Sequence, residues 1–485
     1  MLNVTSSRVE PSPDIPASIL VVDLDRTLVR GDVLLEGIFG ILAERPWLLA
    51  RLLWQLLQGR GRFKAWVAEH CLLKPGLLPY NAAVLEYVRS QRARGARIVL
   101  ATAANERYAA AVADHLGLFD EVIASPPDRH LAGRARLDRI EQRWPGQSFW
   151  YVGDATGDRS TCDAAARSVL VDPSPPVARR VQRAGKLERV LSSDRKPWRS
   201  LMRAMRPHQW AKNALVLLPG LTSWGYYPIE RLPSLLIACV AMCLLASAVY
   251  LFNDALDLSA DRVHPKKRHR PMASGDLPLR LGIGAAVALV IFAAACAWVL
   301  APSAQTLLVA YAVISTAYSL GLKRVPAADL AILASLYVGR VVLGAEVLEA
   351  GYSSWFLMFV TLAFLSFAAV KRYVELAAMD PATAVSNRRG YVASDAPLIQ
   401  MFGVAAAFSA SIVLALFTTS EAVSPHYTRP GPLLFLCPLF LVYMLRVWLS
   451  ANRRSMHHDP VAYVLRDPAA YVLGLAGLAV ILLAR

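Results

Sequence analysis

Long segments without a charged side chain fill the second half of the chain, and they constrain its fold more than any other feature. Six of them lie beyond residue 198, at 232–253, 281–322, 350–370, 396–420, 430–445 and 468–484. A helix of about 20 apolar residues crosses the hydrocarbon core of a bilayer. The second segment is too long for one span, and Ala301-Pro302-Ser303 near its middle predicts a turn between two helices.

Adding a shorter helix at 210–224 and another at 329–348 predicts an all-α membrane bundle of about nine spans. The hydrophobic content of 55% and the formal net charge of +16 fit an integral membrane protein with basic loops, not a nucleic-acid-binding protein. The intervening loops carry only Arg231 and Arg429 as basic residues, whereas alternate loops are strongly basic, at 266–270, 323–324, 371–389 and 453–454.

The positive-inside rule places the basic loops in the cytoplasm. The first 16 residues are polar and contain prolines, so we expect no signal peptide and a cytoplasmic N-terminal domain. The expected location is therefore the cell (inner) membrane, with several spans.

Before residue 194 the pattern differs, because short strand-like runs alternate with helical ones, as in an α/β domain. The apolar run 18–22 ends at Asp23 and Asp25, a second run ends at Thr102, and a third ends at Asp154 with Asp158 following. Open α/β sheets place their sites at the carboxyl ends of the strands. These side chains are therefore predicted to meet at one edge of the sheet.

Three strands ending in such groups, in this order, resemble the haloacid dehalogenase (HAD) superfamily of phosphotransferases over about residues 18–175. The resemblance implies a Rossmann-like fold, with Asp23 as the nucleophile that forms an aspartyl-phosphate and Asp25 as the general acid and base. Thr102 would donate a hydrogen bond to the phosphate. Asp154 and Asp158, together with Asp23, would hold Mg2+.

One motif departs from the HAD pattern. The lysine that the family carries in a G-x-x-K context is replaced by Arg136 in Gly133-Arg134-Ala135-Arg136. A planar guanidinium can still neutralise the phosphoryl group, with different geometry. Residues 31–74 are predicted to form a small helical cap, whose tryptophans, Trp47, Trp54 and Trp66, could instead meet the membrane or its lipid substrate. A domain kept only as a scaffold is the alternative to an active phosphatase.

The membrane part carries an acidic run where its first long segment ends. Asn253 is followed by Asp254, Asp257 and Asp261, whose spacings of three and four residues place all three carboxylates on one face of a helix. Such a face suits Mg2+ on a diphosphate. A solvated helix end with chance acids is the alternative.

A basic run, 264–275, follows the acids and includes Arg270-Pro271. The N-D-x-x-D-x-x-x-D run followed by R-P-x-x-x-G resembles the UbiA-type membrane prenyltransferases. The resemblance implies that Asp254 and Asp257 are catalytic, that these two and Asp261 hold Mg2+, and that Asn253 and Arg270 contact the substrate.

Three further motifs resemble the decaprenyl-phosphate phosphoribosyltransferase branch of that family. They are R-P-x-Q-W-x-K-N at 206–213, A-Y-S-L-G-L-K-R at 317–324 with Asp329, and K-R-Y-V-E-L at 371–376. The candidate substrate-binding residues in these motifs are not assigned individually, and they are Lys212, Lys323, Arg324, Lys371, Arg372 and Glu375.

Ordinary prenyltransferases carry a second aspartate cluster where this chain has Lys371 and Arg372. A cationic subsite suits a phosphorylated acceptor better than a neutral aromatic ring. Arg340, eleven residues beyond Asp329, lies about 16 Å further along a helix and near the middle of the bilayer. It is a candidate substrate-binding residue, or else half of an ion pair between helices.

We therefore expect transfer of 5-phosphoribose from phosphoribosyl diphosphate to a polyprenyl phosphate, with Mg2+ in both domains and removal of the phosphate by the HAD-like domain. The alternatives are prenyl transfer from a polyprenyl diphosphate to an aromatic or other small acceptor, and a membrane-anchored phosphatase. The expected domains are a tail at 1–17, the HAD-like domain at 18–175, a linker at 176–205 and the transferase at 206–485. No nucleic acid partner is expected, and the oligomeric state stays open.

Overall fold

The computed structural model describes residues 18–155, 157–193, 195–222, 229–350, 353–379, 390–420, 423, 427–456, 460–464 and 466–484. The chain folds into two compact units. The first comprises Met1–Ala204 and Leu251–Ala285, and the second comprises Met205–Tyr250 and Ala286–Arg485.

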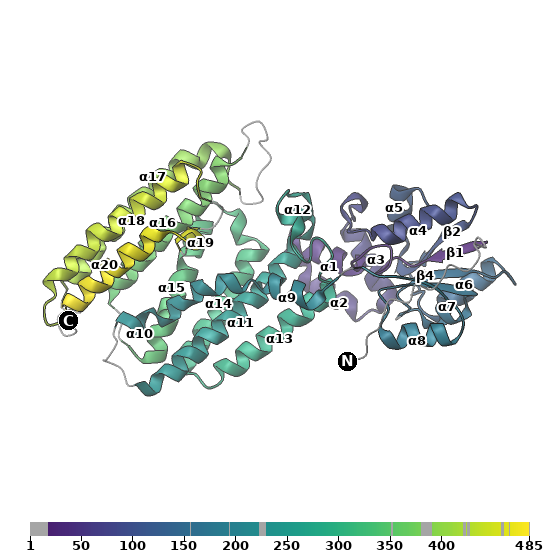
Figure 1. Ribbon diagram of the computed structural model, residues 1–485, viewed down its shortest axis with the longest axis horizontal. Coiled ribbons are helices and arrows are strands. Elements are labelled where there is room, and N and C mark those ends of the chain that lie inside the picture. The colour runs from purple at the N-terminus through teal and green to yellow at the C-terminus, as the bar shows by residue number, and fades with distance from the viewer. Residues whose placement is uncertain are drawn as a thin grey trace. The chain divides into compact units, whose positions relative to one another are not determined.

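The first unit is built on a six-stranded parallel sheet with the order β3-β2-β1-β4-β5-β6 (Figure 1). Its strands are β1 Ile19–Val22, β2 Arg97–Asn105, β3 Glu121–Ser125, β4 Trp150–Gly153, β5 Arg167–Val171 and β6 Leu187–Leu191. All four residues of β1 are buried, as expected for a central strand covered on both faces. Val22 pairs with Leu100 of β2 and with Val152 of β4, which aligns the ends of three strands.

Helices cover both faces of this sheet. They are α4 Ala82–Ala93, α5 Glu106–Leu116, α6 Arg134–Arg143, α7 Arg159–Ala164 and α8 Pro175–Arg183. Leu20 and Val22 pack with Val88 of α4 in one hydrophobic core. Val21 packs with Ile140 of α6 in the other core, because successive strand residues point to opposite faces. The predicted HAD-like α/β domain is confirmed.

The expected linker 176–205 contains helices and a strand, and the domain end at residue 175 stays a prediction. Strand β6 pairs with β5 through Leu170 and Val190, so five residues of the expected linker 176–205 belong to the sheet. Strand β6 reads Leu-Glu-Arg-Val-Leu and none of its residues is buried. Such a polar edge strand gives only a weak apolar signal in the sequence. Helix α9, Pro197–Met205, follows it.

The segment predicted as a cap is helical. It contains α1 Val33–Glu44, η1 Pro46–Leu48, α2 Leu49–Leu56 and α3 Arg60–His70, and η2 Pro75–Leu77 follows it. Trp66 is buried in the core of the cap with Leu52 and Phe63, so its alternative assignment to membrane contact is wrong. Trp47 and Trp54 are exposed.

The first unit also includes the acidic and basic runs. The end of α11 leads into α12 Leu258–Val263 and η5 Lys267–His269, and α13 begins at Leu279. Helix α1 packs against α12. The phenyl rings of Phe39 in α1 and Phe252 in α11 meet edge to face, with centroids 6.1 Å apart.

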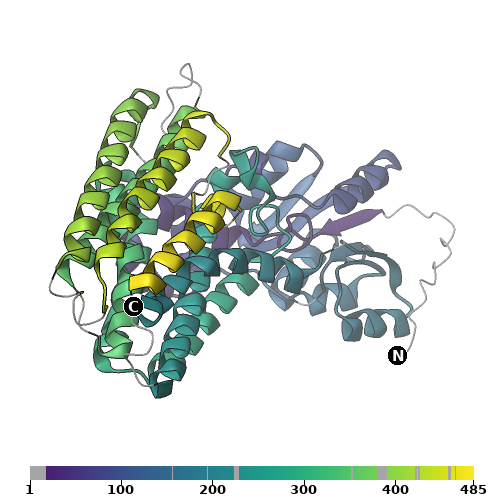
Figure 2. The same ribbon diagram turned by 60° about the vertical axis from the view of Figure 1, so that its left-hand side comes forward.

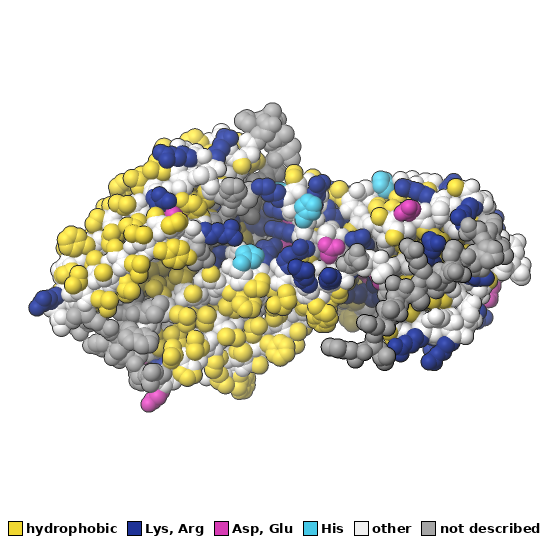
Figure 3. Space-filling view, in the orientation of Figure 1, with side chains coloured by type: hydrophobic (Ala, Val, Ile, Leu, Met, Phe, Trp, Pro, Cys, Tyr) yellow, Lys and Arg dark blue, Asp and Glu magenta, His cyan; other side chains and the backbone are white. Residues whose placement is uncertain are grey.

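The second unit is helical (Figure 2). Its long helices, some of which begin or end in the first unit, are α11 Leu232–Leu256, α13 Leu279–Ala297, α14 Pro302–Leu320, α15 Ala328–Leu348, α16 Ser354–Ala377, α17 Ala396–Thr418, α18 Leu436–Asn452 and α20 Pro468–Ala484. Its shorter elements are η3 Pro207–Leu217, α10 Leu218–Thr222, η4 Ile229–Arg231, η6 Leu322–Arg324, η7 Ala393–Asp395, η9 Gly431–Phe435 and α19 Pro460–Val464. Hydrophobic side chains cover the visible face of these helices (Figure 3).

Seven helices within the described residues are long and apolar enough to cross a membrane, and Pro468–Ala484 is a shorter apolar helix. The turn predicted at residues 301–303 is confirmed, because α13 ends at Ala297 and α14 starts with Pro302. The predicted count of nine is approximate. The expected helix at 210–224 is instead the 3-10 segment η3 followed by the five-residue α10.

Candidate functional site

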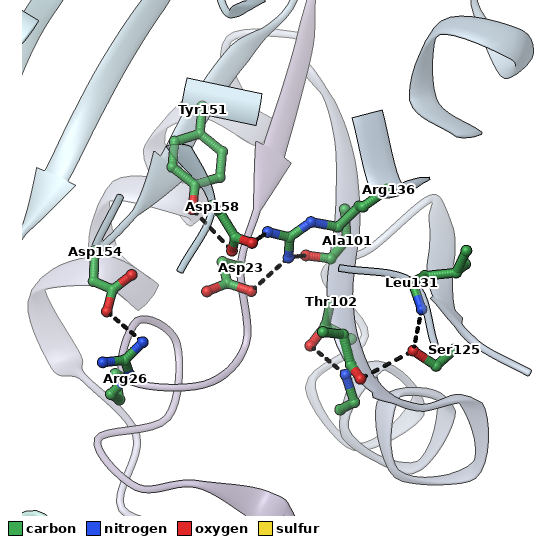
Figure 4. Close-up of polar contacts among 12 residues, drawn as sticks. Asp23, Arg26, Ala101, Thr102, Ser125, Leu131, Arg136, Tyr151, Asp154 and Asp158 are labelled. Carbon is green, nitrogen blue, oxygen red and sulfur yellow. Dashed lines mark hydrogen bonds and ion pairs between the residues drawn. The ribbon is translucent and has the colours of Figure 1, made fainter. Parts of the chain in front are cut away.

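The carboxyl ends of β1, β2 and β4 bring the predicted phosphatase residues to one edge of the sheet. Asp23 directly follows β1, Thr102 lies in β2, and Asp154 directly follows β4. All three side chains are nearly inaccessible to solvent. Figure 4 shows the Asp23 carboxylate between Asp154 on one side and the Arg136 guanidinium on the other.

Arg136 occupies the place where the HAD pattern expects a lysine. Its side chain is completely buried, and Nη1 donates to Oδ1 of Asp23 at 3.0 Å and to the carbonyl oxygen of Ala101 at 3.0 Å. Its Nη2 contacts the carboxylate of Asp158. Gly133, with φ of +56°, immediately precedes α6 and turns the chain into this helix. The G-x-x-R spacing therefore brings one cation between two carboxylates.

Asp25 is held differently from Asp23. Its Oδ1 accepts a hydrogen bond from the backbone N–H of Val33 at 2.8 Å, at the start of α1. Burial and the nearby charge of Asp32 raise the pKa of Asp25 to about 8. This carboxyl group therefore carries a proton near neutral pH, as a general acid requires.

The residues that could hold a metal in this unit are carboxylates, which suit a hard cation such as Mg2+. The pKa of Asp23 is raised by burial, in part opposed by Arg136, and the negative charge of Asp154 adds to the rise. The two carboxylates repel each other, and a cation between Asp23 and Asp154 would relieve this repulsion. The two residues therefore fit a metal ion. Arg26 Nη2 contacts Asp154 Oδ2 at 2.9 Å, and Asp158 is engaged by Arg136. Within the described residues, no three Asp, Glu, His or Cys side chains form a metal-binding group.

Two carboxylates of the acidic run, those of Asp254 and Asp261, face the same arginine. The backbone N–H of Asp257 donates to the carbonyl of Asn253, and that of Asp261 donates to the carbonyl of Asp257, so helical hydrogen bonding continues from α11 into α12. Arg270 Nη1 lies 3.2 Å from Asp254 Oδ1 and 2.7 Å from Asp261 Oδ2. Both carboxylates therefore face the same side.

Asp254 and Asp261 are buried. Burial raises the pKa of Asp261 to about 6, although Arg270 lowers it, and the charge of Asp254 raises it further. Asn253 Nδ2 donates to Asp257 Oδ2 at 3.1 Å. The carboxylates of Asp254, Asp257 and Asp261 could bind a divalent cation. The Arg270 guanidinium beside them could bind an anionic group of the substrate.

In the second unit, Arg340 lies in α15 and is buried. Its Nε donates to Asn213 Oδ1 at 2.8 Å, its Nη2 donates to the Tyr311 hydroxyl at 3.0 Å, and its Nη1 donates to the Leu336 carbonyl. The guanidinium also lies over the rings of Tyr311 and Tyr337. Among the described residues, the hydrogen-bonding partners of Arg340 are all neutral, so the ion pair considered as its alternative is not formed within this part of the chain.

Arg372 is enclosed in an ion pair. Its Nε lies 2.8 Å from Asp329 Oδ2, its Nη2 lies 2.7 Å from the same atom, and its Nη1 contacts Glu375. Tyr318 donates to the other oxygen of Asp329 at 2.7 Å. The side chains of Arg372 and Asp329 are 1% and 0% exposed, so this ion pair holds α16 to α15. That Arg372 and Glu375 contact substrate stays a prediction, and the geometry adds a positioning role for Arg372.

The remaining predicted cations lie on other elements of the second unit. Lys212 is in η3, Lys371 is in α16, and both are half-buried. Lys323 and Arg324 are in η6, where Lys323 is buried and Arg324 is exposed.

Comparison with known proteins agrees with both halves of this geometry. The model of the UbiA prenyltransferase family matches residues 214–481, and the model of the haloacid dehalogenase-like hydrolases matches residues 20–162. The UbiA match covers more than half of the chain. The chain belongs to the UbiA prenyltransferase family.

The relatives differ in how much of this chain they match. An uncharacterised protein, y4nM, of Sinorhizobium fredii is 32% identical over 94% of this chain and 89% of its own length. Nodulation protein NoeC of Azorhizobium caulinodans is 31% identical over 58% of this chain and 92% of its own length. Decaprenyl-phosphate phosphoribosyltransferase of Mycobacterium tuberculosis is 39% identical over 36% of this chain and 60% of its own length.

The chain is thus a multi-pass membrane enzyme, in which a UbiA-type transferase domain is fused to a HAD-type hydrolase domain. Three contact residues were missed by the sequence reasoning. Asn213 ends a motif that was recognised, but Tyr311, which also accepts a hydrogen bond from Arg340, stands in an apolar segment without a motif. Lys64 of α3 donates to the carbonyl of Ala103, next to Thr102, and no pattern in the cap marks it.

Proposed function

We propose that the membrane domain transfers 5-phosphoribose from phosphoribosyl diphosphate to a polyprenyl phosphate. The observation that carries this proposal is the buried Arg340, whose hydrogen-bonding partners among the described residues are all neutral. A buried charge without a counter-ion is costly, and an anionic ligand would compensate it. A neutral aromatic acceptor would not compensate the charge of Arg340. The mycobacterial relative, by its name, acts on decaprenyl phosphate.

In the proposed reaction, the bond between the anomeric carbon of ribose and the diphosphate oxygen breaks, and diphosphate leaves with the electron pair. An oxygen of the lipid phosphate forms the new bond to that carbon. UbiA and HAD enzymes generally use Mg2+, and here Asp254, Asp257 and Asp261 would hold the ion, which supplies neutralisation of the diphosphate charge. Asn253 and Arg270 would orient the donor.

We further propose that the HAD domain removes the 5-phosphate from the lipid-linked product. The Asp23 carboxylate attacks phosphorus, the ribose 5-oxygen leaves, and the Asp25 carboxyl group donates its proton to that oxygen. Water, deprotonated by Asp25, then hydrolyses the aspartyl-phosphate. Thr102 and Arg136 would contact the phosphoryl oxygens, and Asp23 with Asp154 would hold Mg2+ in this domain. The strongly basic loops support an inner-membrane protein whose HAD domain lies in the cytoplasm.

The test uses the purified full chain in lipid nanodiscs with phosphoribosyl diphosphate, a polyprenyl phosphate and Mg2+. Wild type should yield lipid-linked ribose and inorganic phosphate. Asp23→Asn should still release diphosphate but accumulate the lipid-linked 5-phosphate, as mass analysis of the lipids would show. The same phosphorylated lipid from both proteins would refute the phosphatase step.

A parallel incubation with a polyprenyl diphosphate and 4-hydroxybenzoate tests ordinary prenyl transfer. We expect no product there. Efficient prenylation, with no product from phosphoribosyl diphosphate, would refute the proposed transferase reaction.

A further inference from the structure

The cap of the HAD domain carries an apolar surface that its own fold does not use. Helix α2 and the preceding turn expose Trp47, Leu49, Leu53, Trp54 and Leu57, which together are called the α2 face. Trp54 is 62% exposed and Leu57 is 82% exposed. Leu49, Leu53 and Leu57 are spaced by four residues and therefore line one side of the helix.

Only one residue of α2 anchors it to the cap. Leu52 is buried against Ile41, Phe63 and Trp66 in the cap core. A helix that faces water on its outer side would normally carry polar residues there. Large apolar residues on the outer face indicate a surface that another apolar medium covers.

The charges around the α2 face identify that medium. Between residues 44 and 62 the chain carries the acid Glu44 and four arginines, Arg45, Arg51, Arg60 and Arg62. All four arginines are exposed. Helices that lie at the surface of an anionic bilayer typically carry tryptophan and leucine on one face and arginine beside it.

The same cap is fastened to the two points where the chain enters the membrane. Phe39 of α1 meets Phe252 near the end of α11, a candidate membrane span that ends at Leu256. Asp32, which caps α1, forms an ion pair with Arg280 in the first turn of α13, the next span. These contacts lie within the first unit, and they tie the cap to the ends of two candidate membrane spans.

We propose that the α2 face (α2 in Figure 1) inserts into the cytoplasmic interface of the bilayer and keeps the phosphatase site at the headgroups of membrane lipids. The partner is the lipid surface itself, with anionic headgroups at the arginines and acyl chains at the tryptophan and leucine side chains. This inference concerns membrane contact and does not depend on which lipid the phosphatase hydrolyses.

The test places a bimane fluorophore on Leu53→Cys in full-length protein from which the six native cysteines have been removed. The control is Glu141→Cys on α6, an exposed position in the same unit. In nanodiscs of phosphatidylcholine and phosphatidylglycerol, brominated lipid should quench position 53 at least about twofold more than position 141, with the reverse order for iodide in solution.

Two outcomes would overturn the proposal. Iodide quenching at position 53 equal to that at position 141 would show that the α2 face is in water. Protection from both quenchers would show that protein, such as a second copy of this chain, covers it.

A functional arm, which rests on the proposed phosphatase activity, compares wild type with the double variant Leu53→Glu, Trp54→Glu. Hydrolysis of a phosphomonoester lipid in vesicles should fall about tenfold, because interfacial contact is lost, while hydrolysis of soluble p-nitrophenyl phosphate should stay unchanged. Equal losses on both substrates would contradict a role in lipid access. If the wild type hydrolyses neither substrate, the phosphatase proposal fails, and the quenching result still decides membrane contact.

Discussion

Arg262 and Glu36 form a bidentate ion pair across 226 residues of sequence, with Nη1 to Oε2 at 2.7 Å and Nη2 to Oε1 at 2.8 Å. Both side chains are only 8% exposed. Arg262 lies in α12, one residue beyond Asp261, and its Nε donates to the carbonyl of Ala273. The pair therefore connects the cap of the phosphatase to the loop that carries the acidic run of the transferase.

Removal of one partner should destabilise the first unit. We expect Glu36→Gln to cost about 3 kcal/mol, because it leaves a buried guanidinium without a counter-charge. Thermal unfolding in detergent measures the loss, and Glu69→Gln on the exposed side of α3 is the control. The double variant Glu36→Arg, Arg262→Glu should recover part of the lost stability. A double variant that is no more stable than Glu36→Gln would contradict a stabilising ion pair between Glu36 and Arg262.

The phosphatase site should require both the positive charge of Arg136 and the planar shape of its guanidinium. Arg136→Ala leaves Asp23 and Asp158 buried without a cation, and we expect about 3 to 5 kcal/mol of destabilisation with loss of hydrolysis. Arg136→Lys keeps the charge but cannot reach both carboxylates at once, so kcat should fall about tenfold. Rates with p-nitrophenyl phosphate and melting temperatures separate the two effects. Full activity of Arg136→Ala would exclude the proposed role.

The acidic run should control transfer and not folding. Asp254→Ala or Asp257→Ala should abolish Mg2+-dependent release of diphosphate, because each variant removes a ligand charge from the donor site. The melting temperature should change little, because Arg270 keeps its ion pair with Asp261 in both variants. Glu230→Gln, an exposed position in η4, is the matched control. Substantial transfer by either alanine variant in detergent would exclude this site.

Two neighbouring cations of α16 should behave differently. Lys371→Ala should raise the KM for polyprenyl phosphate about tenfold more than the KM for phosphoribosyl diphosphate, as expected for a residue that binds the acceptor. Arg372→Ala should instead lower the melting temperature, because Asp329 would be left buried and unpaired. Initial rates and thermal unfolding of both variants distinguish the roles. An unchanged melting temperature for Arg372→Ala would contradict its structural assignment.

Much of the site could be read from local sequence because each motif is contiguous. Asp23 and Asp25 follow one strand, and the carboxylates of the acidic run share a helix face through spacings of three and four residues. Arg136 was identified from the G-x-x-R spacing, and the parallel order of the strands brings it to Asp23. The edge strand β6 was missed, because its five residues are only partly covered and carry two charges.

The sequence by itself determined the two fold classes, the segments that span the membrane and the carboxylates at the ends of strands and helices. These follow from periodicity and apolar length, which act within a few residues of each other. Only the tertiary structure decided that Arg372 forms a buried ion pair with Asp329 and that Glu36 of the cap holds Arg262 beside the acidic run. It also decided that the partners of Arg340 among the described residues are neutral. Such partners come from distant segments, and the partner of a buried charge is set by how the helices pack, which no local pattern encodes.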